Sequence, residues 1–155
     1  MRIKVGLCVM LAGIVFTSAA ACGVTTYMSY AFTMENGDQV TVRLDTTDGH
    51  KISQGNGRVY ILLEEETVLQ CIFLDTELCT AYDEEIRANP DVTILAERSQ
   101  DGNKYLFYTV EGAAGTEHDF LVKISDTDTG MLIGSLSGEE TALRAFKHLH
   151  LSKAD

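Results

Sequence analysis

Residues 68–74 read VLQCIFL, and this stretch decides the fold class. Bulky apolar side chains occupy both odd and even positions, so both faces of a strand here should be covered. Three further stretches share this two-sided pattern: Val59–Leu63 (VYILL), Tyr105–Val110 (YLFYTV) and Phe120–Ile124 (FLVKI). The sequence therefore predicts a sheet that is sandwiched between other elements.

Two stretches have the spacing of amphipathic helices and can cover this sheet. The first runs from Thr76 to Ala88, with Asp75 or Thr76 as its N-cap and Pro90 closing it. The second begins at residues 137–140 (SGEE), which match a capping box. Its inward side chains are Ala142, Leu143, Ala145, Phe146 and Leu149. One helix on each face is enough to cover the sheet.

Short turns connect most of the predicted strands. Asn36-Gly37 supplies a pair of positive φ angles for a tight hairpin, and Asp101-Gly102-Asn103 joins two later strands. Links this short cannot carry a parallel crossover. The prediction is an α+β sandwich: a mainly antiparallel sheet of about seven or eight strands covered by two helices, in one domain over residues 27–155.

The N-terminus has the three zones of an export signal in the right order. Arg2 and Lys4 form a basic region, Val5 to Phe16 is uncharged and apolar, and residues 17–21 (TSAAA) are small. Residues 1–21 are therefore predicted to be a signal peptide. An uncleaved membrane anchor is the alternative, but the apolar run is a little short for a span of roughly 20 residues.

Three small residues directly before Cys22 resemble the lipobox of bacterial lipoproteins, although that family usually has Leu where this chain has Ala19. The resemblance implies a lipid on the Cys22 sulfur, cleavage before Cys22, and a short tether over residues 22–26. Ordinary cleavage after Ala21 would instead release a soluble secreted protein.

Charge excludes one class of partner. The chain has 12 Lys plus Arg against 23 Asp plus Glu, a net charge of -11. Loss of Arg2 and Lys4 with the signal peptide leaves ten cations and a net charge of -13. Nucleic acid is not expected as a partner, because each contacted phosphate favours a cation. An acidic domain also does not adhere to anionic lipid, so membrane attachment would depend on the lipid at Cys22.

The order of elements over roughly residues 58–151 carries a further resemblance. A strand at 120–124, a turn at 126–130, a short strand, a terminal amphipathic helix and a last short run are similar to small bacterial lipoproteins of unassigned function. The layout is also similar to PsbP-like domains. The resemblance implies a binding or assembly role more than catalysis.

Cys71 and Cys79 have two interpretations. After export, a disulfide between the strand and the helix would close a short loop and contribute roughly 2 to 3 kcal/mol. Alternatively, both thiols are buried as small apolar groups, because Cys71 lies in an apolar strand and Cys79 on the apolar stripe of the helix. Cys8 lies in the predicted signal peptide and has no role after cleavage.

The other polar groups have mainly structural interpretations. His148 and His150 would share one face of a strand, but no third metal ligand is evident. Residues 126–130 (DTDTG) resemble the opening of a calcium loop but lack its later ligands, which favours a hairpin turn. The acidic runs 64–66 and 83–85 are typical of solvated surface. Neither a metal nor a cofactor is predicted.

No motif of a known catalytic class occurs in the chain. The favoured hypothesis is an exported, lipid-anchored envelope protein whose domain binds a small ligand or a protein without chemistry. The alternatives are a structural accessory subunit of an envelope assembly and a small exported enzyme that uses acidic residues. A cleft lined by carboxylates with raised pKa would favour the enzyme.

Overall fold

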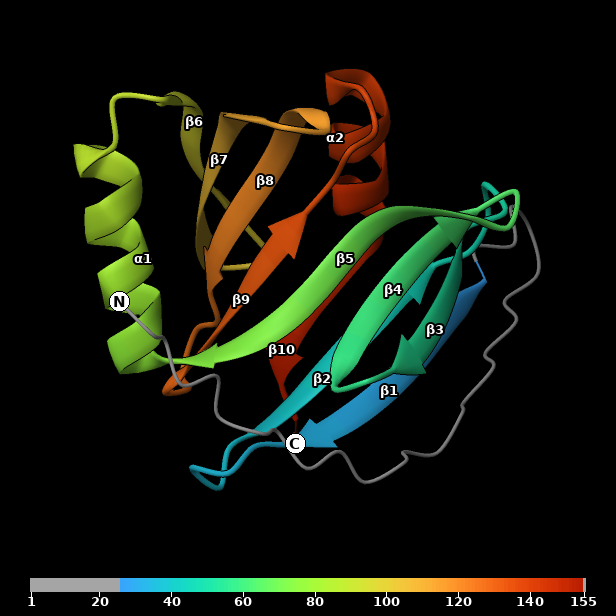
Figure 1. Cartoon of the computed structure of the whole chain (residues 1–155). Helices are drawn as coiled ribbons and strands as arrows, with labels where there is room; N and C mark the ends of the chain where they lie inside the picture. Colours follow the sequence, from blue (N-terminus) through green and yellow to red (C-terminus); the bar gives the residue numbers. More distant parts are fainter. Residues whose placement is uncertain (1–25, 155) are drawn as a thin grey trace.

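The computed structural model describes residues 26–154, which form an α+β fold of two antiparallel sheets and two helices (Figure 1). The elements are β1 (Tyr27–Thr33), β2 (Gln39–Asp45), β3 (Lys51–Gly55), β4 (Arg58–Leu63), β5 (Glu66–Asp75), α1 (Thr76–Ala88), β6 (Val92–Gln100), β7 (Asn103–Gly112), β8 (Gly115–Lys123), β9 (Thr129–Gly134), α2 (Glu139–His148) and β10 (Leu149–Lys153). The predicted fold class is confirmed.

The strands divide into a large and a small sheet. The large sheet has seven strands in the order β3-β4-β5-β9-β8-β7-β6, and the small sheet has the order β1-β2-β10. The expectation of one sheet with seven or eight strands therefore describes the large sheet, and the remaining three strands form a second layer. This division depends on β10, which pairs with β2 from the far end of the chain (Leu149 opposite Leu44).

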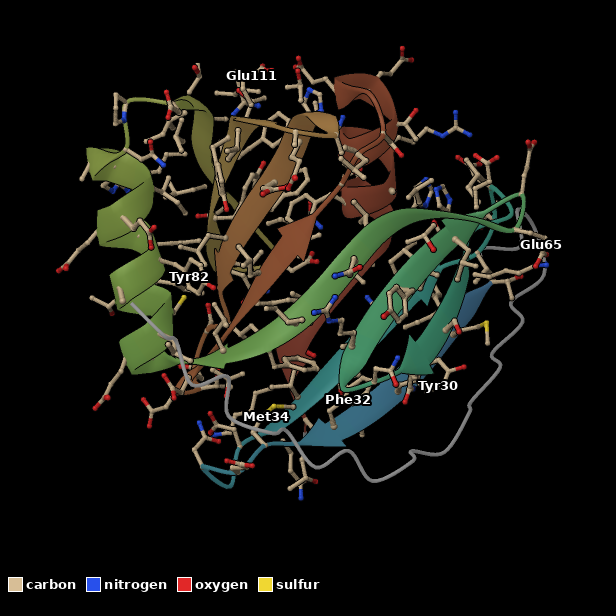
Figure 2. The ribbon with its side chains drawn as sticks, in the orientation of Figure 1. Tyr30, Phe32, Met34, Glu65, Tyr82 and Glu111 are labelled. Carbon is tan, nitrogen blue, oxygen red and sulfur yellow. The ribbon has the colours of Figure 1, made fainter. Side chains whose placement is uncertain are left out.

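Helix α1 covers one face of the large sheet and has the predicted bounds. The Asp75 side chain accepts a hydrogen bond from the Leu78 amide at 2.8 Å, which caps the first turn. The helix ends before Asn89 and Pro90, as a proline requires. Its buried stripe packs on the sheet in a cluster that contains Cys79, Ile86, Leu106, Tyr108 and Leu121, and Tyr82 points from the helix toward the strands (Figure 2).

Helix α2 and the small sheet share the opposite face. Phe146 of α2 stacks on Phe120 of β8 with ring centroids 4.2 Å apart. Phe32 and Met34, which follow the same face of the small sheet (Figure 2), belong to this second cluster with Val42 and Leu44. The large sheet is therefore the middle layer of three, because apolar residues at both parities of β5 and β8 are buried on opposite sides.

Three details of the sequence prediction are wrong. The capping box at residues 137–140 does not form: the N-cap is Gly138, which has no side chain, and the helix begins one residue later than a Ser137 cap would place it. Leu149 lies in β10 and not in the helix. At the first hairpin, only Gly37 of the predicted pair has a positive φ, because a five-residue loop separates β1 from β2.

The side chain of Asn36 in that loop instead joins the two sheets. Its amide donates to the Asp38 carboxylate at 3.0 Å and to Thr129 Oγ1 at 3.2 Å. Asp38 Oδ2 also accepts from the Asp128 amide and from Thr129 Oγ1, both at 2.7 Å. The β1–β2 loop is thereby held against the turn between β8 and β9.

Gly130 of β9 lies where a side chain of α1 packs closely against the large sheet. A Cβ atom at this position would lie 2.6 Å from Cys79 Sγ and 2.8 Å from the Val122 carbonyl oxygen. Both distances are well inside van der Waals contact. The absence of a side chain at Gly130 is therefore what lets Cys79 pack over the strand.

We expect Gly130→Ala to lower the free energy of unfolding by about 1 to 3 kcal/mol, the usual cost of overpacking. Urea denaturation followed by circular dichroism measures this loss. Gly55→Ala is the matched control, since no atom lies within 4 Å of a Cβ there. Adding Cys79→Ala to Gly130→Ala should restore part of the stability, and a double variant no more stable than Gly130→Ala would contradict the packing account.

Candidate functional site

The predicted lipidation site lies outside the described residues, because the structure describes the chain only from residue 26. The same is true of the signal peptide over residues 1–21 and of most of the tether. Within residues 26–154, neither helix combines the length and the apolar character that crossing a membrane requires. The candidate site must therefore be sought on the folded domain.

The two cysteines of the domain are not bonded to each other. Both are buried free thiols. Cys71 belongs to the cluster on the small-sheet side of the large sheet, and Cys79 belongs to the cluster on the α1 side. The disulfide expected as one alternative is therefore wrong, because the sheet itself separates the two thiols. Cys71 packs among apolar side chains, and this burial raises the pKa of its thiol to about 12.

The two C-terminal histidines do not share a face of one strand. His148 ends α2, whereas His150 lies in β10 and its Nδ1 is 2.6 Å from Asp101 Oδ2. The chain changes from helix to strand between them, which turns the rings apart. In the part of the chain that the structure describes, no group of three or more His, Cys, Asp or Glu side chains is arranged to hold a metal ion.

The calcium-like stretch at residues 126–130 forms the connection between β8 and β9. Thr127 Oγ1 donates to the Ile124 carbonyl oxygen at 2.9 Å and accepts from the Thr129 amide at 3.1 Å. These bonds confirm the hairpin interpretation. The acidic run 64–66 lies at the exposed turn between β4 and β5, where Glu65 pairs with Lys51.

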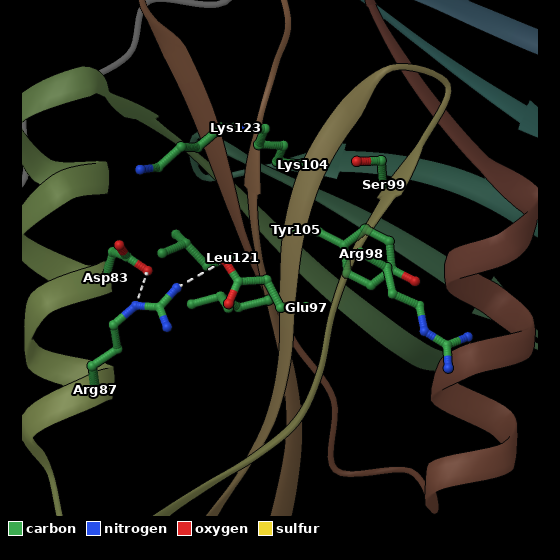
Figure 3. A pocket seen from close by; sticks show the side chains of 10 residues that line it. Asp83, Arg87, Glu97, Arg98, Ser99, Lys104, Tyr105, Leu121 and Lys123 are labelled. Atoms are coloured by element: carbon green, nitrogen blue, oxygen red, sulfur yellow. Dashed lines mark hydrogen bonds and ion pairs between the residues drawn. The ribbon is translucent and has the colours of Figure 1, made fainter.

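A pocket of about 360 Å³ lies between α1 and strands β6, β7 and β8 (Figure 3). Its lining combines charged and apolar side chains: Asp83 and Arg87 from α1, Glu97, Arg98 and Ser99 from β6, Lys104, Tyr105 and Leu106 from β7, and Leu121 and Lys123 from β8. Its volume is at the lower end of the range for small-molecule sites. Arg98 points away from α1 toward α2, so its charge is directed out of the pocket (Figure 3).

Strand pairing explains how the pocket floor is ordered. On the face toward α1, Leu106 of β7 lies opposite Leu121 of β8, and two residues further along Lys104 lies opposite Lys123. Side chains two residues apart share a face and lie roughly 7 Å apart. A row of two leucines is therefore followed by a row of two lysines, which lie together at one end of the pocket (Figure 3).

The other end of the pocket holds an ion-paired arginine. Arg87 Nε lies 3.1 Å from Asp83 Oδ1, and its second amino group lies 3.1 Å from Glu97 Oε1. Hydrogen bonding to Glu97 and the charge of Asp83 raise the pKa of Arg87. By contrast, Lys104 and Lys123 have no ion-pair partner within residues 26–154. Because like charges opposite each other on neighbouring strands repel, the lysine end favours an anion between them.

Asp119 is the carboxyl group of the domain that most resembles an acid catalyst. It lies opposite Tyr108 on β7, and burial raises its pKa to about 6 although it accepts a hydrogen bond from the Ser135 amide at 3.3 Å. It does not line the pocket, where both carboxylates, Asp83 and Glu97, pair with Arg87. This pocket is therefore not the cleft, lined by carboxylates with raised pKa, that would favour an enzyme using acidic residues.

A second polar group lies on the other side of the domain, around His50. This histidine is only 1% exposed, and among the residues that the structure describes neither of its ring nitrogens has a hydrogen-bond partner. Its ring stacks on that of His148 at a centroid distance of 4.8 Å. Burial, together with the nearby charges of His148 and Arg144, lowers the pKa of His50.

His148 is held in this stack by two carboxylates. Its Nδ1 lies 3.5 Å from Asp45 and its Nε2 lies 3.2 Å from Asp48, which also pairs with Arg144 at 3.5 Å. An unpartnered buried ring costs about 1 to 3 kcal/mol. Burial in this stack opposes protonation of His50, and the charges of Asp48 and Asp45 offset this effect only in part.

Sequence reasoning missed both the pocket and the histidine stack. The one local signal for the pocket is Asp83 and Arg87 at i and i+4 on the predicted helix, which is the spacing of an ion pair. Aligning the two strands across residues 112–115 would have placed Lys104 opposite Lys123. Nothing local relates His50 to His148, because they are 98 positions apart in the chain.

His50→Phe keeps a ring against His148 and removes the unpartnered nitrogens, so we expect it to stabilise the domain by about 1 kcal/mol at pH 8. The gain should grow at pH 5. Because the pKa of His50 is lowered on folding, the unfolded chain binds the proton first as the pH falls through 6.5, and this group then costs stability. Urea denaturation at the two pH values measures the gain.

At each pH, the free energy of unfolding of the variant must be compared with that of the wild type. Asp119 acts in the opposite direction, since its raised pKa of about 6 stabilises the folded state at low pH and this contribution is lost as the pH rises from 3.8 to 6. His150→Phe is the control for removal of a histidine. If the free energies of unfolding of His50→Phe and wild type differ by the same amount at pH 8 and pH 5, the lowered pKa of His50 is contradicted.

Comparison with known proteins adds no relative: no protein-family model, no curated protein and no solved structure matches the chain. The resemblances to bacterial lipoproteins and to PsbP-like domains therefore stay predictions from the sequence.

Proposed function

We propose that this chain is an exported, lipid-anchored protein of the cell envelope whose domain binds a small ligand without chemical conversion. The observation that carries the binding role is the pocket between α1 and β6 to β8, which has a volume of about 360 Å³, is lined by Leu106 and Leu121, and holds two lysines that have no ion-pair partner within residues 26–154. Pockets with this mixture of apolar surface and a few convergent polar groups are the usual form of small-molecule sites.

The support for the anchor comes from the sequence. A basic, an apolar and a small-residue zone precede Cys22, the position at which a lipoprotein would carry its lipid. The first strand begins at Tyr27. At roughly 3.5 Å per residue, the four intervening residues would hold the domain within about 15 Å of the membrane surface.

The arrangement of layers suits a binding domain on a short tether. The tether enters β1 in the small sheet, whereas the pocket lies under α1 on the opposite face of the large sheet (Figure 1). The thickness of the middle sheet therefore separates the attachment point from the mouth of the pocket. A ligand would reach the pocket from the side of α1.

The anchor is tested by Cys22→Ser, which removes the sulfur that a lipid would modify. We expect the wild-type chain in the membrane fraction of its native host and the variant in the soluble fraction, because an acidic domain has no charge attraction for anionic lipid. Cys79→Ser is the control for loss of a thiol. An unchanged distribution of the Cys22→Ser chain would contradict lipidation.

Binding is tested with a variant that fills the pocket. Ser99→Trp introduces a large side chain beside Lys104, its partner across β6 and β7. Native mass spectrometry of the Cys22→Ser chain, after dialysis against a small-molecule extract of the envelope, should show a discrete adduct that Ser99→Trp loses. Ser53→Trp is the matched control, because Ser53 is an exposed serine of β3, the opposite edge strand of the same sheet.

Retention of the adduct by Ser99→Trp, or its loss from both tryptophan variants, would contradict a ligand site at this pocket. Absence of any adduct from the parent chain would do the same.

A further inference from the structure

The dipeptide Asn-Gly occurs twice in the chain, at Asn36-Gly37 and at Asn56-Gly57. In this dipeptide the backbone nitrogen of the glycine can attack the side-chain amide carbon of the asparagine. Ring closure gives a five-membered succinimide, and glycine has no Cβ atom to hinder the approach. Both asparagines are exposed, so access to water does not distinguish the two sites. Their hydrogen bonds do distinguish them.

The side-chain amide of Asn36 is fixed by hydrogen bonds at both its nitrogen and its oxygen. Its Nδ2 donates to Asp38 Oδ2 at 3.0 Å and to Thr129 Oγ1 at 3.2 Å. Its Oδ1 accepts from the Asp38 amide at 2.9 Å. The nitrogen that would attack is also engaged, since the Gly37 N–H donates to the Met34 carbonyl oxygen at 3.0 Å. Ring closure at Asn36 would disrupt each of these bonds.

Asn56 and Gly57 have none of these restraints. They form the two-residue turn between β3 and β4, where Gly55 pairs with Arg58. Within residues 26–154, neither the Asn56 side chain nor the Gly57 N–H has a hydrogen-bond partner. Apart from its chain neighbours, no atom lies within 4 Å of a Cβ placed on Gly57. The side chain can therefore turn toward the glycine nitrogen without losing a hydrogen bond.

The β3–β4 turn also lies at one edge of the large sheet, where the backbone opens easily (Figure 1). Among the described residues, strand β3 pairs only with β4, and its one buried side chain is Ile52. Exposed hairpin ends with so few buried contacts open at low free energy. Opening the β1–β2 loop is more costly, because Asp38 Oδ2 also accepts from the Asp128 amide and from Thr129 Oγ1, both at 2.7 Å. The backbone rotation that ring closure needs is therefore easier at Asn56.

We propose that Asn56 is a site of spontaneous deamidation, while Asn36 in the same folded chain stays intact. The Gly57 nitrogen forms a bond to Asn56 Cγ, the Cγ–Nδ2 bond breaks, and Nδ2 leaves as ammonia with the proton that the Gly57 nitrogen loses. One water molecule then opens the succinimide at either carbonyl and leaves aspartate or isoaspartate. The reaction consumes only water and needs no ligand, so it is independent of the proposed binding function.

The two products have different effects on the turn. Aspartate leaves the backbone unchanged, and Asp-Gly is, like Asn-Gly, a preferred pair for a two-residue hairpin turn. Isoaspartate moves the side-chain methylene into the backbone, so the turn no longer fits between Gly55 and Arg58. Amide hydrogen exchange in β3 should therefore be faster in the isoaspartate form than in the unmodified chain.

Peptide mapping by mass spectrometry measures both sites in one experiment. The full chain is incubated at pH 8, in buffer and in parallel in guanidinium chloride, and each conversion raises a peptide mass by about 1 Da. In buffer we expect Asn56 to be converted at least about tenfold faster than Asn36, because the hydrogen bonds of Asn36 raise its barrier. In guanidinium chloride the two rates should become similar, because unfolding removes those hydrogen bonds.

Variants in the folded protein test the cause of the difference. Asp38→Ala removes an acceptor of Asn36 Nδ2 and should raise the rate at residue 36, and Thr129→Val gives the same test if Asp38→Ala does not fold. Asn56→Gln is the control, since its longer side chain cannot form the five-membered ring. Equal rates at residues 36 and 56 in buffer, or conversion of Asn56 in guanidinium chloride but not in buffer, would overturn the proposal. A rate at residue 36 that neither variant raises would overturn the explanation of its protection.

Discussion

Burial of both faces of the seven-stranded sheet is the constraint on which the rest of the structure depends. Strands β5 and β8 have bulky apolar residues at successive positions, so exposure of either face would place a row of them in water. Helix α1 covers one face, and α2 with the small sheet covers the other. The chain must therefore return at its end, where β10 joins β2, to complete the second layer. Loss of any one layer would expose the middle sheet.

The pocket follows from the dimensions of this arrangement. A helix with its side chains is about 10 Å across. Seven strands at roughly 4.8 Å spacing span almost 30 Å. The single helix α1 cannot cover that width, and it packs mainly on β5, β8 and β9. Toward β6 and β7 the sheet face is left partly open, and the charged residues at 97, 104 and 123 lie where the apolar cover ends.

Local sequence signals predicted the helix bounds and the hairpins, but they could not predict the pairing of strands that lie far apart in the chain. The bounds of α1 follow from Asp75 as a cap and from Pro90, and several hairpins follow from Gly-containing turns. The separate small sheet could not be predicted, because the pairing of β10 with β2 joins segments more than 100 residues apart. The candidate site lies within residues 83–123, but it forms only when α1 packs back on strands β6 to β8, and no local pattern predicts that packing. The disulfide failed for this reason too: closeness in sequence said nothing of which side of the sheet each thiol occupies.

Net charge and local charge act over different distances in this domain. The net charge of the chain, -11, repels an approaching anion, but this repulsion is screened beyond about 8 Å at physiological ionic strength. Inside that distance the ligand meets the ammonium groups of Lys104 and Lys123 before it meets the carboxylates at the Arg87 end. Salt should therefore weaken the long-range repulsion more than the contacts with the lysines, whose hydrogen bonds act at touching distance. An acidic domain can in this way repel anionic polymers over its surface and still present two ammonium groups to a small ligand at the pocket.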